Sequence, residues 1–290
     1  RSLVGKSRLM TIKIVTDSTS DLEASDAEAY GITILPVSIN IGEKTYQDGV
    51  DLTRAEFYMN LPTYTPFPTT ASPSLHAFQQ TYQTLVDQGA TGIISIHIAG
   101  SLSGTVNAAI KAAEAITKIP IQVIDSGNLT LGTGFQALAA AKAAMQGKSL
   151  EEVIAVVKDL AQRTVSFALP DTLDYLRRGG RLSLVQYEVG KLFNIKPILV
   201  MRHSTMKLEK AFTFRNSMKR VMEIISEHFL PIEEFSIIHT GTLERVEEFK
   251  LMAKQLLPPD YVPRITEVTP AIGAHVGPGG LGAVCISAVR

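Results

Sequence analysis

The sequence predicts an α/β protein of two domains, an N-terminal α/β/α domain with a parallel sheet and a C-terminal α+β domain with a mixed or antiparallel sheet. Its 290 residues exceed the usual size of one domain. Up to about residue 164, short β-branched runs alternate with helical repeats, which is typical of a parallel sheet covered on both faces. Beyond that point fewer helices separate the predicted strands, which favours antiparallel pairing.

In the first half, each predicted strand is a short run rich in Ile and Val. These strands are expected at residues 12–17, 34–39, 92–98 and 121–125. A polar loop at 18–21 follows the first strand, and the helix after it ends at Gly31. A turn is expected at Gly42-Glu43, directly after the second strand.

Capping signals mark two helix starts in this half. Thr53 with Glu56 three positions later is a capping pattern. Ser72 followed by Pro73 predicts an N-cap and a first-turn proline for a helix that runs to Gly89. Further helices are expected after Thr105 and at residues 132–146 and 150–162.

The second half is expected to hold strands at 166–169, 196–200, 207–212, 235–239 and 281–289, with helices at 217–228 and 243–257. We place the domain boundary near residue 165, which gives domains of residues 10–165 and 166–290. Residues 1–9 carry positive charges without the apolar stretch of an export signal. We expect them to be a leader or an expression-derived segment outside the fold.

Composition excludes several classes of function. Lys+Arg and Asp+Glu are balanced at 28 each, so the whole chain has no net attraction for nucleic acid or an anionic bilayer. Residues 92–110 are too polar to span a membrane, so we expect transient membrane contact at most. The single cysteine, Cys285, predicts no disulfide and suits the cytoplasm. The six histidines lack paired spacing, so no metal site is expected.

Two glycine patterns resemble catalytic motifs without meeting their requirements. Residues 277–282 have the spacing G-x-G-x-x-G, but they precede a predicted strand, whereas a dinucleotide-binding loop opens a helix. In Gly100-Ser101-Leu102-Ser103-Gly104 the serines are off register for a nucleophile elbow. Neither pattern therefore predicts a nucleotide site or a hydrolase.

Four loops rich in hydroxyl groups or glycine are expected where parallel strands end, which is where open α/β sheets bind ligands. They lie at residues 17–21, 68–74, 99–105 and 125–128. The second and third lead into helix N-termini, whose free N–H groups favour an anion. The alternative is that Ser72 and Ser103 serve only as helix caps.

Two further segments are candidates for binding an anion. His275 lies among the small residues of segment 273–280, which we take to be a loop that leaves room for a ligand. The basic turn at 177–183, together with Lys191 and Lys196, predicts a local positive patch. A structural histidine and a solvated helix end are the alternatives.

Eight motifs, in order along the chain, carry a resemblance to a known family. They are Asp17-Ser18-Thr19-Ser20-Asp21-Leu22, Pro36-Val37-Ser38, Thr70-Ala71-Ser72-Pro73-Ser74, Leu102-Ser103-Gly104-Thr105, Val123-Ile124-Asp125-Ser126, Gly179-Gly180-Arg181-Leu182-Ser183, Ile195-Lys196-Pro197-Ile198 and Gly273-Ala274-His275-Val276-Gly277. In identity and order they resemble the DegV family, which includes the fatty-acid-binding subunits of bacterial fatty acid kinase.

The resemblance implies a lipid-binding protein that has no catalytic residues and no cofactor of its own. One long-chain fatty acid, of roughly 14 to 18 carbons, would lie buried near the domain junction. Its carboxylate would contact Thr70, Ser103 and His275. A separate kinase subunit would phosphorylate it to an acyl phosphate for phospholipid synthesis. Positions near the head group or facing the kinase would be Arg181, Ser101, Gly104 and Gly277.

The chain departs from the family pattern at Phe212, where relatives carry arginine, and this change affects the surface that would face a kinase. A second hypothesis is an acyl or phosphoryl hydrolase or transferase with Ser103 as nucleophile and His275 as general base. The segment around His275 contains no carboxylate to orient such a base. A binding and presenting protein is therefore our first hypothesis.

Overall fold

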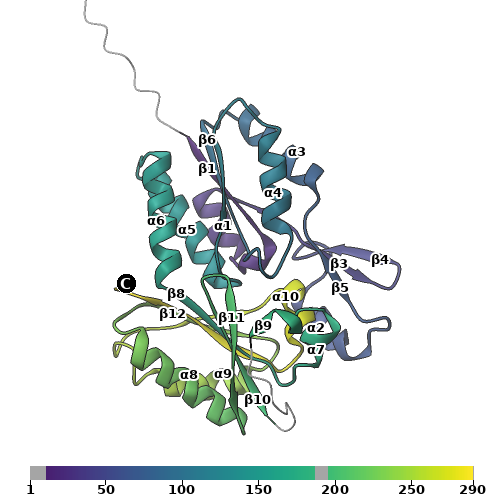
Figure 1. Cartoon of the computed structure of the whole chain (residues 1–290), viewed down its shortest axis with the longest axis vertical. Helices are drawn as coiled ribbons and strands as arrows, with labels where there is room; N and C mark the ends of the chain where they lie inside the picture. Colours follow the sequence, from purple (N-terminus) through teal and green to yellow (C-terminus); the bar gives the residue numbers. More distant parts are fainter. Residues whose placement is uncertain (1–10, 187–194, 290) are drawn as a thin grey trace, which may run out of the picture.

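The computed structural model describes residues 11–186 and 195–289 (Figure 1). Its first part is a four-stranded sheet in the order β2-β1-β6-β7, in which every neighbouring pair is parallel. These strands are β1 (Ile12–Asp17), β2 (Ile32–Leu35), β6 (Gly92–His97) and β7 (Ile121–Asp125). The predicted parallel sheet is thus confirmed.

Helices cover both faces of this sheet (Figure 1). On one face, α1, α5 and α6 pack against side chains such as Ile14 and Ile94. On the other, α3 and α4 bury Phe78 and Tyr82 against Val15. The helices are α1 (Ala24–Tyr30), α3 (Leu75–Asp87), α4 (Thr105–Glu114), α5 (Leu131–Met145) and α6 (Leu150–Arg163).

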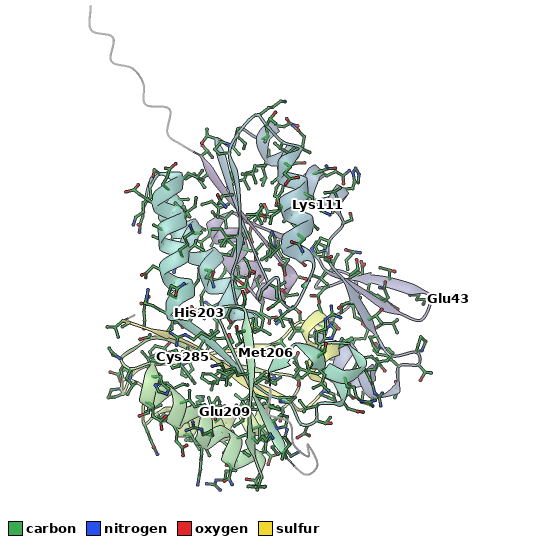
Figure 2. All side chains as sticks on the ribbon, viewed as in Figure 1. Glu43, Lys111, His203, Met206, Glu209 and Cys285 are labelled. Atoms are coloured by element: carbon green, nitrogen blue, oxygen red, sulfur yellow. The ribbon has the colours of Figure 1, made fainter. Side chains whose placement is uncertain are left out.

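A small antiparallel sheet projects from the side of the parallel sheet, and Glu43 lies at its tip (Figure 2). It consists of β3 (Ser38–Ile41), β4 (Lys44–Gln47) and β5 (Thr69–Ala71). The prediction of one strand at 34–39 is wrong, because this segment belongs to two sheets. The chain leaves β2 at Pro36, which has no N–H to donate to a ladder.

Segment 68–74 also differs from the prediction, because it holds β5 rather than a loop at the end of a parallel strand. The helix after it starts at Leu75, and its cap is Ser74, whose Oγ accepts the Ala77 N–H at 3.1 Å. Ser72 is therefore not the N-cap. By contrast, Thr53 caps α2 (Arg54–Asn60) as predicted, by accepting the Glu56 N–H.

The second part is a seven-stranded mixed sheet in the order β13-β12-β14-β8-β10-β11-β9. The pairs β12–β13 and β9–β11 are parallel, and the other neighbouring pairs are antiparallel, which confirms a mixed sheet. The strands are β8 (Thr164–Leu169), β9 (Val185–Gln186), β10 (Lys196–Arg202), β11 (Thr205–Ala211), β12 (Ile232–His239), β13 (Arg264–Glu267) and β14 (Leu281–Ser287).

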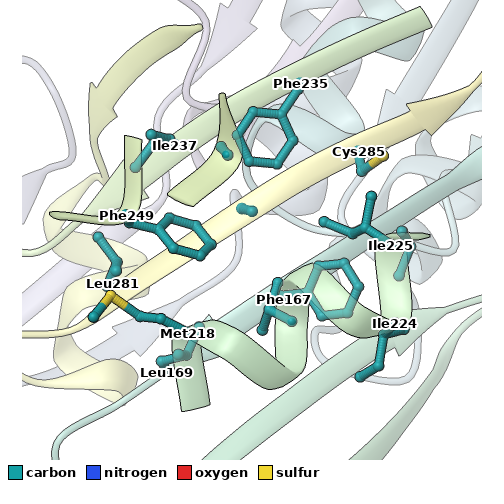
Figure 3. Packing of buried hydrophobic residues seen from close by; sticks show 14 of the residues in the cluster. Phe167, Leu169, Met218, Ile224, Ile225, Phe235, Ile237, Phe249, Leu281 and Cys285 are labelled. Carbon is teal, nitrogen blue, oxygen red and sulfur yellow. The ribbon is translucent and has the colours of Figure 1, made fainter. Parts of the chain in front are cut away.

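One face of the mixed sheet is covered by α8 (Phe214–His228) and α9 (Leu243–Ala253), over a core that contains Phe167, Phe235 and Phe249 (Figure 3). Cys285 is fully buried in this core, and burial raises its thiol pKa to about 12, as befits a small hydrophobic residue.

The opposite face turns toward the first part of the chain. There Val284 and Ile286 pack with side chains from α2, α5 and α10 (Pro270–Val276). The sequence did not predict α10 or α7 (Asp174–Arg178), both of which are short. Within 11–186 and 195–289, no helix is both long and apolar enough to cross a membrane.

Candidate functional site

A cavity of about 300 Å³ lies between the parallel sheet and the mixed sheet. Its walls come from β5, the turn after β6, α7, β10, β11 and α10, and most of the lining side chains are apolar. The polar side chains of the wall are Thr19, Thr70, Ser72, Ser103, Arg181 and His275. A largely apolar wall with a few convergent polar groups is typical of a small-molecule site.

His275 and Thr70 form a hydrogen-bonded pair in this wall, with 2.9 Å between the imidazole Nε2 and the Thr70 Oγ1. Burial, assisted by the nearby positive charge of Arg181, lowers the pKa of His275 to about 4. The imidazole is therefore neutral at pH 7. His275 lies in the last turn of α10, so our expectation of a loop at this position is wrong.

The chain leaves no spare room beside the His275 ring. A Cβ atom placed on Gly179 would lie 2.1 Å from His275 Nδ1, so any side chain at this position would displace the ring. Nδ1 itself is buried without a hydrogen-bond partner. Glycine at position 179 therefore allows α7 and α10 to approach closely, and it fixes where the imidazole lies.

Arg181 and Ser103 complete the polar part of the wall. The Arg181 guanidinium donates to the Leu102 carbonyl at 3.4 Å and to the Gly179 carbonyl at 2.7 Å, so it joins the turn after β6 to the end of α7. Ser103 Oγ accepts the Thr105 N–H at 3.3 Å at the start of α4, while its side chain lines the cavity. The Ser103 side chain thus both caps the start of α4 and faces the cavity.

Three predicted positions lie around this group in different ways. Gly104 lines the cavity as the N-cap of α4. Ser101 is exposed on the turn that precedes it. Gly277 is buried against an aromatic ring, because a Cβ there would lie 2.4 Å from Tyr175 Cδ2, and its φ of +83° favours glycine.

The predicted basic patch is largely paired with carboxylates. Arg177 and Arg178 both contact Asp174, and Lys196 contacts Asp171 at 3.1 Å. Lys191 lies outside the described residues. Arg181 instead donates to the backbone carbonyls of Leu102 and Gly179. Its side chain lines the cavity.

A narrower space of about 30 Å³ continues from the cavity into the interior, toward Phe167, Ile238 and Leu281. Residues that line both spaces are Leu129, Ala168, Leu199, Met206, Ile272 and Val276. The site therefore has a polar wall at one end and an apolar interior at the other. Such an arrangement suits a molecule with an anionic head and an apolar tail.

A fully buried network that the sequence analysis missed lies beneath the site. Asp17 Oδ2 lies 2.8 Å from His97 Nδ1, His97 Nε2 lies 2.6 Å from Ser95 Oγ, and Tyr82 donates to Ser95 at 2.8 Å. Asp17 also accepts the Thr19 N–H at 3.1 Å. The signal in the sequence was Ser95-x-His97, two residues on one face of a strand beside the end of β1.

This network has the composition of a catalytic triad, but its side chains are closed off from solvent. Asp17, Ser95 and His97 are each 0% exposed. We interpret it as a structural network that holds the ends of β1 and β6, because Asp17 also accepts the Ile98 N–H at 3.3 Å. Thr19 and Ile98 both line the cavity, so the network positions part of its wall.

Two more buried carboxyl groups hold the helix that carries His275. Asp21 Oδ1 accepts the Thr269 N–H at 2.8 Å, just before α10, and contacts Arg54 at 3.4 Å. Burial raises the pKa of Asp21 to about 8, although the Arg54 charge lowers it in part. Asp48 accepts from Ser18 Oγ at 2.7 Å, and burial raises its pKa to about 6.

The structure does not pair Ser103 with His275, as the second hypothesis of a hydrolase or transferase requires. His275 Nε2 pairs with Thr70, whereas the hydroxyl of Ser103 pairs with Thr105 Oγ1 at 2.9 Å. Among the residues that the structure describes, no cluster of three or more His, Cys, Asp or Glu side chains could hold a metal ion.

Comparison with known proteins gives the same family as the eight motifs. The sequence model described as "Uncharacterised protein, DegV family" matches residues 11–288. The chain belongs to the DegV family. A DegV domain-containing protein of Streptomyces coelicolor is 33% identical over 279 residues, covering 95% of this chain and 98% of that protein. Another, from Caldanaerobacter subterraneus, is 34% identical over 274 residues, covering 93% and 97%.

Solved DegV structures share the whole fold. DegV of Bacillus subtilis, described as a fatty acid binding protein, has a TM-score of 0.86 at 28% identity and covers 96% of this chain and 100% of its own. A Thermus thermophilus DegV protein, described by its fatty acid binding, has a TM-score of 0.85 at 28% identity with the same coverage. A stearic acid-binding protein of Eubacterium ventriosum has a TM-score of 0.83 at 26% identity, covering 95% and 98%.

Proposed function

We propose that this DegV protein binds one long-chain fatty acid in the cavity between its two sheets. The carboxylate would lie against Thr70, Ser103 and His275, near Arg181, and the tail would extend along the apolar interior. The observation that carries this proposal is the pair of adjoining spaces, the outer one with polar side chains in its wall and the inner one apolar. The fatty acid binding of the Bacillus and Thermus relatives supports it.

The physical chemistry of the site suits such a ligand. Burial of a 16-carbon tail, at roughly 0.8 kcal/mol per methylene, contributes on the order of 12 kcal/mol before the costs of association. A carboxylate removed from water needs hydrogen-bond donors and a compensating charge. The hydroxyl groups of Thr70 and Ser103 are available as donors, and Arg181 supplies a positive charge that its two backbone contacts do not neutralise.

The proposal extends to what happens to the bound acid. A separate kinase subunit would phosphorylate the carboxylate to an acyl phosphate, and this chain would present it in the cytoplasm without a catalytic residue of its own. The presenting surface would lie around Ser101, Gly104 and Arg181, with Gly277 behind it. Phe212, at a position where the family resemblance implies arginine, is 84% exposed beyond the far end of β11.

Organic extraction of the freshly purified protein, followed by mass spectrometry, tests the binding. We expect one fatty acid at near equimolar amount, and we expect the double variant Thr70→Ala/Ser103→Ala to retain much less. Thr69→Ala is the matched control, since Thr69 is the exposed neighbour of Thr70 on β5. If the double variant and wild type retain equal amounts, the assignment of the head-group residues is wrong.

Addition of a candidate kinase with ATP tests the proposed phosphorylation of the bound fatty acid. We expect phosphate transfer to the bound acid only when both proteins are present. A fatty acid that is bound but never phosphorylated in the presence of such a kinase would restrict the function to binding.

A further inference from the structure

Six residues line both the outer cavity and the inner space, and we call this shared part of the wall the constriction; β11 contributes a methionine to it. Met206 lines both spaces, whereas Met201 lines only the inner one. The two residues are direct partners in the antiparallel β10–β11 pair, so their side chains lie on the same face of the sheet. Figure 2 shows Met206 between the two sheets, at the level where they meet.

Met206 is buried in an apolar cluster beside the cavity. It is 7% exposed and packs with Leu199, Met201 and Leu176 in a cluster under the outer cavity. Other residues at the constriction are branched or short, namely Leu129, Ala168, Leu199, Ile272 and Val276. Met206 alone among these six has a long, unbranched side chain, and its flexible thioether adapts to irregular spaces.

The inner space is too small to hold a fatty acid tail as it stands. Its volume of about 30 Å³ has room for about two water molecules, since one water needs roughly 10–15 Å³ of such space. A tail that passes the constriction therefore needs a side chain to move aside, and the methionine does so at the lowest cost in strain. Branched side chains have fewer alternative rotamers.

We propose that Met206 is the residue that sets how far a fatty acid tail reaches into the protein, and so which tail lengths bind. This inference rests on the proposed function, because it concerns the tail end of the same ligand. Short acids end before the constriction. Longer acids bind only when the Met206 side chain swings away and joins the inner space to the outer cavity.

Substitutions at Met206 separate the size of this side chain from its flexibility. Met206→Ala removes three heavy atoms and leaves the constriction open for about two further methylenes. Met206→Ile keeps the number of heavy atoms but adds a β-branch, which suits a strand and stiffens the side chain. Met145→Ala is the matched control, since Met145 is an exposed methionine at the end of α5.

The measurement is competition among myristate, palmitate and stearate offered together to the delipidated protein, with the bound acids quantified by mass spectrometry. We expect Met206→Ala to raise the bound stearate-to-myristate ratio roughly tenfold, as burial of two further methylenes would. Met206→Ile should lower this ratio, and Met145→Ala should leave it unchanged.

The possible results distinguish this inference from the proposed function. If wild type binds none of the three acids, the proposed function fails. If wild type binds them and both Met206 variants keep the wild-type ratio, Met206 does not set tail length and the binding function stands. Should Met206→Ala fail to fold, Met206→Ile alone tests the proposal, because an unchanged ratio in that variant would overturn it.

Discussion

Gly179→Ala tests the role of the His275–Thr70 pair without changing either residue. Gly179 has φ −76° and ψ 0°, which alanine adopts without strain. Its new methyl group would nevertheless lie 2.1 Å from His275 Nδ1 and 2.8 Å from Cε1, so the imidazole has to move. The substitution therefore acts on the ligand site through the position of one ring.

The expected loss of fatty acid affinity follows from these distances. Real Cβ atoms essentially never approach another atom within 3.0 Å, so the ring shifts by at least about 0.9 Å. The Nε2–Oγ1 distance to Thr70 is 2.9 Å, so a ring shift of this size along the bond, in either direction, either stretches it beyond the hydrogen-bond range or forces Thr70 to move. In the proposed complex the displaced imidazole also loses its contact with the charged carboxylate, and a hydrogen bond to a charged group contributes about 1.5–3 kcal/mol, so we expect fatty acid affinity to fall roughly ten- to a hundredfold.

The assay is displacement of a fluorescent fatty acid from the delipidated protein, run beside thermal unfolding. Gly180→Ala is the control, because a Cβ there meets no atom within 4 Å, whereas its φ of +71° makes alanine unfavourable. We expect Gly180→Ala to lower Tm with wild-type affinity and Gly179→Ala to lower affinity. If the folded Gly179→Ala protein binds with wild-type affinity, the pair does not hold the head group.

Two further predictions concern the buried carboxyl groups. Burial raises the Asp21 pKa to about 8, partly offset by Arg54, so the folded protein holds a proton that the unfolded chain releases near the usual aspartate pKa of 3.8. The free energy of unfolding should therefore fall as pH rises from about 4 to 8. In Asp21→Asn, the urea midpoints of unfolding at pH 5 and pH 8 should lie closer together than they do in wild type. An equal separation in the two proteins would contradict this. Asp17→Asn disrupts the acceptor for His97 and Ile98, and we expect a loss of about 2–4 kcal/mol in urea unfolding. A loss below about 1 kcal/mol would show that the network contributes little.

The strands of the parallel sheet could be predicted because their local pattern and their final environment agree. β1 and β6 are short runs of Ile and Val that end up buried on both faces. The segment around Pro36 was misjudged for the opposite reason. Its apolar character continues into β3, and only the tertiary structure shows that β3 pairs with β4 and β5 in another sheet.

The roles of the candidate site residues stay predictions, and only their arrangement can be compared with the structure. Thr70, Ser103, Arg181 and His275 were expected near one head group, and the structure places all four on one cavity wall. The pairing of His275 with Thr70 is a contact between residues 205 positions apart in the sequence. No local pattern predicts such a contact, nor the close approach of Gly179 to His275.

The position of β14 in the mixed sheet has a consequence for the order of events during synthesis. β14 lies between β12 and β8, so β13-β12 and β8-β10-β11-β9 are joined only through it. A ribosome must deliver residues 281–287 before this sheet exists as one unit. His275 precedes β14 by a few residues, so the polar wall of the cavity is completed at the same late stage. On the proposed function, a nascent chain would therefore have no finished site for a lipid, and loading would follow the synthesis of β14.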